Sequence, residues 1–214
     1  MFQDRPHLTR AIGVLLHPSA LPISPTFGSF GEPSREWIKA LAIHGIGVWQ
    51  FLPLAPPDGT GSPYSSPSSF AVNPSFLDAN DLANEGFISF DVIDGLPGEN
   101  ETNDSSVDFR LAEKRSEKLG KLLVESWPSQ NAKRHREFIH WCAGQFWLED
   151  HASFMELRRQ YQGLPWWKWP KAFAFRNPFS LYFWKIKYKQ NLLGHRLIQW
   201  HLDRQWNALR KLAS

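Results

Sequence analysis

Two short apolar runs near the start of the chain stand on either side of one stretch with helical periodicity. The runs are IGVLL at 12–16 and IGVWQFLPL at 46–54, and continuous apolar runs of this length predict strands buried on both faces. Between them, apolar residues recur on one helix face at Trp37, Ile38, Leu41 and Ala42. A strand, a helix and a second strand within about forty residues predict a βαβ unit with two parallel strands.

The segment 53–75 has no periodic pattern and is rich in proline, glycine and serine. This composition excludes a helix interior or a central strand. Loops of this length in a compact domain are usually functional or disordered, and ligands of α/β folds bind beside the loops that leave the carboxyl ends of strands. The apolar residues Tyr64, Phe70 and Val72 favour an ordered, functional loop.

After this loop the pattern becomes helical. The apolar spacing and the turn residues predict helices over 78–85, 107–127, 134–160, 178–190 and 195–212, and a polar linker over 94–106. Trp166, Trp167 and Trp169 precede Pro170 and predict a rigid aromatic corner. Core packing is favoured there over a carbohydrate platform, because aromatic clusters between helices are usually buried.

Composition and charge exclude several classes of protein. With 42% apolar and 21% charged residues the chain is globular rather than disordered, and a formal net charge of +3 argues against a nucleic-acid partner. The single cysteine, Cys142, rules out an internal disulfide, and with eight dispersed histidines no metal or other cofactor is expected. No apolar window reaches the ~18 residues of a membrane helix, and the charged start is unlike a signal peptide, so a cytoplasmic protein without a membrane partner is predicted.

Several separated motifs resemble one enzyme family in the same order along the chain. They are GVLLHPSALP (13–22), VWQFLPLAPP (48–57), GSPYSSPSSFAVNPSFLD (61–78), EGF (85–87), FWLEDHASFMELR (146–158), WWKWP (166–170) and RQWNALRKLA (204–213). Together they resemble the amino-terminal region of the amylomaltases, which are 4-α-glucanotransferases of the α-amylase-like glycoside hydrolase clan. The turn TFGSFG at 26–31 departs from the family, which commonly has a Gly-Ile-Gly-Asp turn there; the glycines are kept and the acid is not.

The resemblance implies a (β/α)8 barrel with helical insertions and the retaining transfer of α-1,4-glucan segments between maltooligosaccharides. The predicted fold class is therefore α/β: a partial TIM (β/α)8 barrel followed by a mostly helical insertion. Residues 1–77 are expected to start the barrel, with the loop 53–75 on its active face, and residues 78–214 to form the helical subdomain. Since a complete barrel needs roughly 250 residues, the chain is expected to be an amino-terminal part of such an enzyme.

The resemblance also assigns a role to Tyr64. In the family, the tyrosine of the SPY motif lies at the rim of the active site, near the subsites that receive the acceptor sugar, and Tyr64 matches it. A phenol ring offers an apolar face to a glucose ring and a hydroxyl for a hydrogen bond, and Ser62 can bond beside it. Packing of Tyr64 onto the barrel is the alternative.

Retaining glycosyl transfer needs two carboxyl groups about 5 Å apart. The resemblance places the family's catalytic carboxylates after Ser214, and no pair within the chain replaces them: Glu149 and Asp150 are adjacent on a helix and point apart, while Asp78 and Asp81 read as first-turn residues. No catalytic residue is therefore expected here, and the chain is predicted to be inactive alone. Its expected partners are an α-glucan or maltooligosaccharide substrate and, as a candidate, a separate carboxy-terminal catalytic piece; a non-catalytic glucan-binding module is the alternative.

Overall fold

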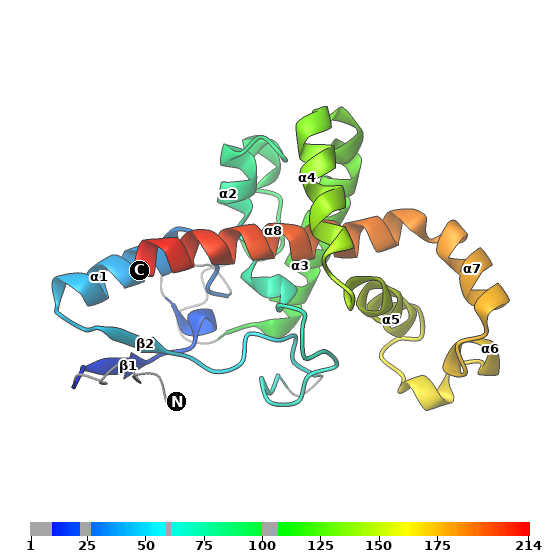
Figure 1. Cartoon of the computed structure of the whole chain (residues 1–214), viewed down its shortest axis with the longest axis horizontal. Coiled ribbons are helices and arrows are strands. Elements are labelled where there is room, and N and C mark those ends of the chain that lie inside the picture. The colour runs from blue at the N-terminus through cyan, green and yellow to red at the C-terminus, as the bar shows by residue number, and fades with distance from the viewer. Residues whose placement is uncertain (1–9, 22–26, 59–60, 100–106) are drawn as a thin grey trace, which may run out of the picture.

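The structure is a computed structural model that describes residues 10–21, 27–58, 61–99 and 107–214. Within these ranges the chain opens with two strands and continues as helices (Figure 1). β1 (Gly13–Leu15) and β2 (Val48–Gln50) pair in parallel. They are connected by α1 (Glu32–Ile43). The predicted strand–helix–strand order and the parallel pairing are confirmed.

Local signals in the sequence account for the bounds of α1. Pro33 lies at the start of the helix, where its missing N–H is not needed, and Glu32 places a negative charge in the first turn. At the other end, the N–H of His44 bonds to the carbonyl of Ala40, and Gly45 follows with a φ of +69°. Glycine adopts this left-handed conformation at little cost, so the helix ends there.

The prediction that both strands are buried on both faces is wrong for the described residues. Each strand pairs over three residues only, and Ile12, Leu15 and Val48 are 69%, 59% and 47% exposed. A strand is buried only where other elements cover it, and no described element covers these positions. The apolar runs therefore form an open sheet surface.

The remaining helices follow in chain order. They are α2 (Ala79–Asn84), α3 (Phe109–Ser126), α4 (Ala132–Ala143), α5 (Leu148–Gln160), α6 (Lys171–Ala174), α7 (Pro178–Lys187) and α8 (Lys189–Ala213), with short 3-10 helices η1 (Pro18–Ala20), η2 (Pro74–Phe76), η3 (Phe90–Val92), η4 (Trp127–Ser129) and η5 (Trp166–Lys168). The helices expected over 78–85 and 107–127 are confirmed within about two residues. Of the expected linker 94–106, residues 94–99 form turns and the rest lies outside the described residues.

Two helix boundaries differ from the prediction. The single helix expected over 134–160 is two helices, because α4 ends at Ala143, with Gly144 as its C-cap, and α5 begins at Leu148. Conversely, the last two helices are almost continuous, since only Tyr188 separates α7 from α8. Apolar spacing alone did not locate these breaks.

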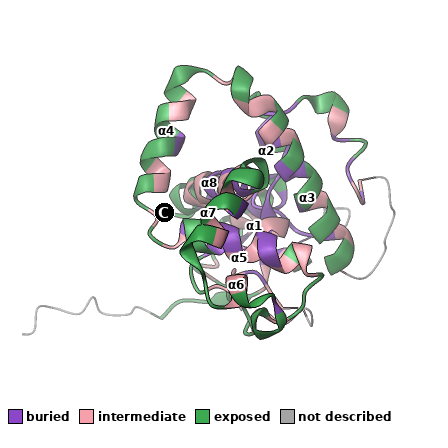
Figure 2. Ribbon diagram, turned by 90° about the vertical axis from the view of Figure 1, so that its right-hand side faces the viewer, coloured by how far each residue is buried: buried purple, intermediate pink, exposed green. Residues whose placement is uncertain are grey.

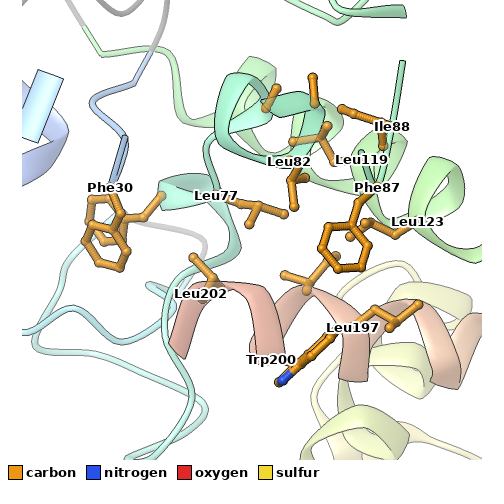
Figure 3. Close-up of a cluster of buried hydrophobic side chains, with 14 of the residues drawn as sticks. Phe30, Leu77, Leu82, Phe87, Ile88, Leu119, Leu123, Leu197, Trp200 and Leu202 are labelled. Atoms are coloured by element: carbon orange, nitrogen blue, oxygen red, sulfur yellow. The ribbon is translucent and has the colours of Figure 1, made fainter. Parts of the chain in front are cut away.

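The main core forms around α8, which packs against α1, α3, α4, α5 and η2. Side chains of α8, among them Leu197 and Trp200, belong to one buried cluster with Leu82 of α2 and Leu119 of α3 (Figure 3). Phe30, from the loop before α1, belongs to the same core. The core therefore joins segments on both sides of the proposed domain boundary at residue 77, and that boundary stays a prediction.

A second, smaller core lies among α5, η5, α6 and α7, at the opposite end of the molecule from the sheet (Figure 1). Trp169 is buried there, and its indole N–H donates to the carbonyl of Leu164 at 2.8 Å. Viewed from this end in Figure 2, buried residues gather along α8 and the helix faces turned toward it. The core role expected for the tryptophan corner is confirmed for Trp169 but not for Trp166 and Trp167, which are 49% and 66% exposed.

Candidate functional site

The candidate site lies where β1 and β2 end and their following loops meet. His17 comes two residues after β1; its Nδ1 lies 2.7 Å from the hydroxyl of Ser19, and its Nε2 lies 3.5 Å from the carbonyl oxygen of Pro53, which follows β2. Burial lowers the pKa of His17, and the Pro53 carbonyl only partly opposes this effect. A neutral His17 therefore joins the two loops.

Within the loop 53–75, hydrogen bonds hold the described residues on either side of Tyr64. The N–H of Asp58 donates to the carbonyl of Ser65 at 2.8 Å, and the N–H of Tyr64 to the hydroxyl of Ser62 at 3.3 Å. The Tyr64 side chain is 74% exposed. Ser62 thus fixes the backbone of Tyr64, while the ring faces solvent and does not pack the loop onto the described sheet. Contact of Tyr64 and Ser62 with a sugar stays a prediction.

The second half of the loop contacts aromatic residues that lie far from it in the sequence. The ring of Phe70 meets Phe146 edge-on at 5.0 Å and lies nearly parallel to Trp147 at 6.4 Å, measured between ring centroids. Phe146 and Trp147 form the turn between α4 and α5. The signal was present in the sequence as a Phe-Trp pair just after Gly144, but only the fold places it beside the loop.

Two glutamines of α8 hold the end of the loop and the segment that follows it. The side-chain amide of Gln199 accepts from the N–H of Val72 at 3.0 Å and donates to its carbonyl at 2.7 Å. Gln205 does the same for Asp78, at 3.0 and 3.1 Å. Both glutamines are buried. Each side-chain amide bonds to the N–H and the carbonyl of one residue, and so satisfies backbone groups that a neighbouring strand would otherwise satisfy. We call this pair of contacts the glutamine clamp.

A buried carboxylate lies beside this segment. Asp78 accepts from the hydroxyl of Ser29 at 2.6 Å and from the N–H of Asp81 at 2.9 Å, so it caps α2. Burial raises the pKa of Asp78, against the lowering effect of these two hydrogen bonds. The Asp81 carboxylate is bound by both outer nitrogens of Arg35, at 2.8 and 2.9 Å. Asp78 and Asp81 therefore hold the loop after β1, α1 and α2 together. Asp81 lies in the first turn of α2, as predicted, whereas Asp78 is the residue that caps the helix.

Glycines allow the close approach of these segments. A Cβ on Gly28 would lie 1.8 Å from the carbonyl oxygen of Pro18, and a Cβ on Gly31 would lie 2.0 Å from the Asp78 carboxylate. No side chain fits at either position without moving its neighbour. The two glycines kept in the TFGSFG turn therefore have a packing reason, and Ser29, between them, supplies a neutral hydroxyl to the buried Asp78.

The remaining candidate carboxylates are also ion-paired. Glu149 binds Arg196 at 2.8 Å and Asp150 binds Arg176 at 2.6 Å, so the two neighbours point to different elements, as predicted. Glu156 is buried on α5. Burial alone would raise its pKa, but hydrogen bonds from His195, Arg159 and Gln160 outweigh burial and hold the pKa of Glu156 at about 2. It is a structural anion and not a proton donor at neutral pH.

The described residues form neither a metal site nor a helix that could span a membrane. Their histidine, cysteine and carboxylate side chains form no group of three or more that could hold a metal ion. None of the described helices combines the length and the apolar character needed to cross a bilayer.

Comparison with known proteins places the whole arrangement in a family. The profile of the 4-alpha-glucanotransferases, glycoside hydrolase family 77, matches residues 16–214. This chain belongs to glycoside hydrolase family 77. The resemblance drawn from the separated motifs is thereby confirmed.

Relatives of the family 77 chain are enzymes of greater length. It is 32% identical to a 4-alpha-glucanotransferase of Synechocystis over 96% of this chain and 40% of that protein. To the enzyme of Thermus thermophilus it is 33% identical, over 95% of this chain and 40% of the relative. The chain thus spans about 40% of the length of the curated relatives it matches.

The family 77 chain also matches solved structures. The amylomaltase of Streptococcus agalactiae, solved in complex with acarbose, superposes with a TM-score of 0.86 at 26% identity, over 96% of this chain and 41% of that one. An amylomaltase of Corynebacterium glutamicum, at 15% identity and a TM-score of 0.67, shares the fold. The parallel strand pair followed by helices is therefore an amylomaltase architecture.

Proposed function

We propose that this chain is the amino-terminal part of a 4-α-glucanotransferase that transfers α-1,4-glucan segments between maltooligosaccharides with retention. In this proposal β1, α1 and β2 begin a (β/α)8 barrel, residues 1–77 belong to it, and residues 78–214 form a mainly helical insertion. The family match and the parallel pairing of β1 with β2 support this reading. The observation that carries it is the exposed Tyr64 on an anchored loop beyond the carboxyl end of β2.

Tyr64 would bind an acceptor sugar through its ring face and its hydroxyl. An exposed phenol ring offers a flat apolar surface for the C–H face of a glucose unit, while the hydroxyl bonds to a sugar hydroxyl. Ser62 fixes the backbone at Tyr64, and His17 and Gln199 fix the loop on which both lie. The loop backbone would therefore lose little freedom when sugar binds, which lowers the entropic cost of binding.

Amide NMR of the labelled chain titrated with maltotriose tests this role. Saturable shifts at residues 61–72 are expected, and Tyr64→Ala should remove them. Tyr182→Ala is the matched control, because Tyr182 is also exposed but lies on α7. The proposal for Tyr64 fails if saturating sugar leaves the loop signals unchanged or if both variants weaken binding equally.

The chain alone is proposed to lack transferase activity. The carboxylates that hold the frame of the site, Asp78 and Asp81, are bound by Ser29, backbone N–H groups and Arg35, and cannot act as a nucleophile and acid pair about 5 Å apart across a sugar. Incubation of the purified chain with maltotriose should therefore release no glucose and form no longer oligomers. Turnover above the blank would overturn this part of the proposal.

A second candidate, association with a separately supplied carboxy-terminal part of the enzyme, is favoured by exposed apolar surfaces. On α7, apolar residues recur on one face and are exposed: Phe179, Tyr182, Phe183 and Ile186. We call them the α7 stripe. Single exposed apolar residues are common on protein surfaces, but the α7 stripe and the open sheet surface each group several of them. Grouped apolar residues of this kind are expected where a surface packs against further protein.

Co-purification with a carboxy-terminal family 77 polypeptide tests this association. Phe183→Asp should weaken the complex, since it places a charge in the α7 stripe. Ile139→Asp is the matched control, because Ile139 is 65% exposed but lies on α4. Equal loss with both variants, or no complex with the parent chain, would count against the second candidate.

A further inference from the structure

A cavity of about 350 Å³ lies among α5, η5, α6 and α7, away from the candidate site. Its size is within the range of small-ligand pockets, roughly 300–1,000 Å³. Its lining residues are Asp150, Ser153, Phe154, Leu157, Trp166, Trp169, Phe173, Ala174, Arg176, Leu181 and Lys185. None of them belongs to the loop 53–75, so the cavity is separate from Tyr64.

The walls of the cavity are aromatic and fixed in place. Trp169 is buried and donates its indole N–H to the carbonyl of Leu164, and its ring packs 5.4 Å from that of Phe154. Trp166 also lines the cavity, but half of its surface remains exposed. The cavity thus offers a rigid apolar floor and one aromatic ring that a ligand can still cover.

The rim of the cavity carries charges of both signs. Arg176 binds Asp150 at 2.6 Å, and Lys185 lies in the same lining. Arg176 has a φ of +55°, a left-handed conformation that costs free energy in any residue but glycine. Backbone bonds from Arg176 to Phe173 and from Asn177 to Ala172 hold this turn. Strained residues of this kind cluster at ligand sites, and here the turn brings a guanidinium to the rim.

This chemistry favours a neutral, polyhydroxylated ligand with an apolar face. An anion would be repelled by Asp150, and a cation by Arg176 and Lys185. A wholly apolar ligand would bury the ion pair of Asp150 and Arg176 and remove its hydrogen bonds to water without replacing them. A sugar ring can stack on Trp166 and place neighbouring hydroxyls on Asp150 as donors and on Arg176 as acceptors.

We propose that this cavity is a second α-glucan-binding site, in which one glucose unit stacks on Trp166 and bonds to Asp150 and Arg176. The identity of the sugar rests on the proposed function, whereas the cavity and its lining do not. The site would hold a glucan at the helical end of the molecule, while the loop of Tyr64 binds sugar at the sheet end.

Amide NMR with maltotetraose separates the two sites within one experiment. Saturable shifts of Ser153 and Ala174 are expected from the parent chain. Trp166→Ala should weaken this binding about tenfold or more, since ring stacking is lost. The matched control is Trp167→Ala, because Trp167 is exposed beside Trp166, at 5.7 Å between ring centroids, but does not line the cavity. Tyr64→Ala should leave the cavity signals unchanged.

The outcomes distinguish this inference from the proposed function. Shifts confined to the loop would overturn the second site and leave the role of Tyr64 intact, whereas shifts confined to the cavity would do the reverse. Equal losses with Trp166→Ala and Trp167→Ala would overturn stacking in the cavity. Cellotetraose is the linkage control: binding to the cavity as strong as that of maltotetraose would overturn the assignment to α-glucans. Amide spectra of each variant without sugar show whether it keeps the fold.

Discussion

The glutamine clamp can be removed one contact pair at a time. Replacing Gln205 with methionine keeps the length and nearly the volume of the side chain, but removes both hydrogen bonds to the backbone of Asp78. Replacing Gln199 with methionine removes the equivalent bonds to Val72. The two variants differ in one respect: the bonds at Asp78 are buried, whereas those at Val72 are partly accessible to water.

The cost of each change follows from this difference. A typical hydrogen bond contributes about 1 kcal/mol to stability, and a buried polar group left without a partner costs about 1–3 kcal/mol. At Asp78 water cannot replace the amide, so Gln205→Met should cost about 3 kcal/mol. At Val72 water can partly do so, and Gln199→Met should cost about 2 kcal/mol.

Hydrogen exchange of single amides measures both effects locally. Since about 1.4 kcal/mol corresponds to a tenfold change, protection of the Asp78 amide should fall about 100-fold or more in Gln205→Met, and that of Val72 about 30-fold in Gln199→Met. Gln190→Met is the matched control, because Gln190 is exposed on the same helix. Unchanged protection at Asp78 in Gln205→Met, or an equal fall in the control, would refute the reasoning.

Three further predictions concern stability. Gly31→Ala should cost about 2–4 kcal/mol in urea unfolding, since its Cβ would lie 2.0 Å from the Asp78 carboxylate. Gly95→Ala, whose nearest neighbour would be 3.7 Å away, should cost under about 1 kcal/mol, and similar costs would contradict the packing argument. Burial holds the pKa of His201 well below 6.5 in the folded chain, so the unfolded chain takes up the proton first and stability should fall as the pH drops below about 6.5. His201→Phe should flatten this fall by up to about 1.4 kcal/mol per pH unit in melting series, and an unaltered slope would refute it. Gln162→Gly should raise the free energy of unfolding by about 0.5–1 kcal/mol, because Gln162 has a φ of +51° after α5; a lower melting temperature would contradict this.

The elements near the start of the chain could be predicted because their signals are local. Pro33 and Gly45 mark the ends of α1, and the apolar runs on either side locate the two strands. The exposure of the strands could not be predicted in the same way. An apolar run indicates that a strand can be buried, but it does not indicate which element would cover the strand. The break between α4 and α5 was signalled by Gly144, but the apolar residues on both sides masked it.

The candidate site shows the same limit. The composition of 53–75 predicts an irregular loop, and the SPY motif draws attention to Tyr64. The groups that hold the loop come from elsewhere: Gln199 is 127 residues from Val72, and Phe146 belongs to another turn. Glutamine in a helix gives no sign that its amide binds a distant backbone, so this part of the site needed the structure.

The distance along the chain between the loop and the glutamine clamp has a consequence for biosynthesis. A ribosome adds roughly 5–20 residues per second, so Gln199 is made some 6 to 25 seconds after Val72. During that interval β1, α1 and β2 can form, but the segment that carries Val72 and Asp78 lacks its final partners. The segment that carries Val72 and Asp78 therefore matures later than β1, α1 and β2, because it waits for Gln199 and Gln205 of α8.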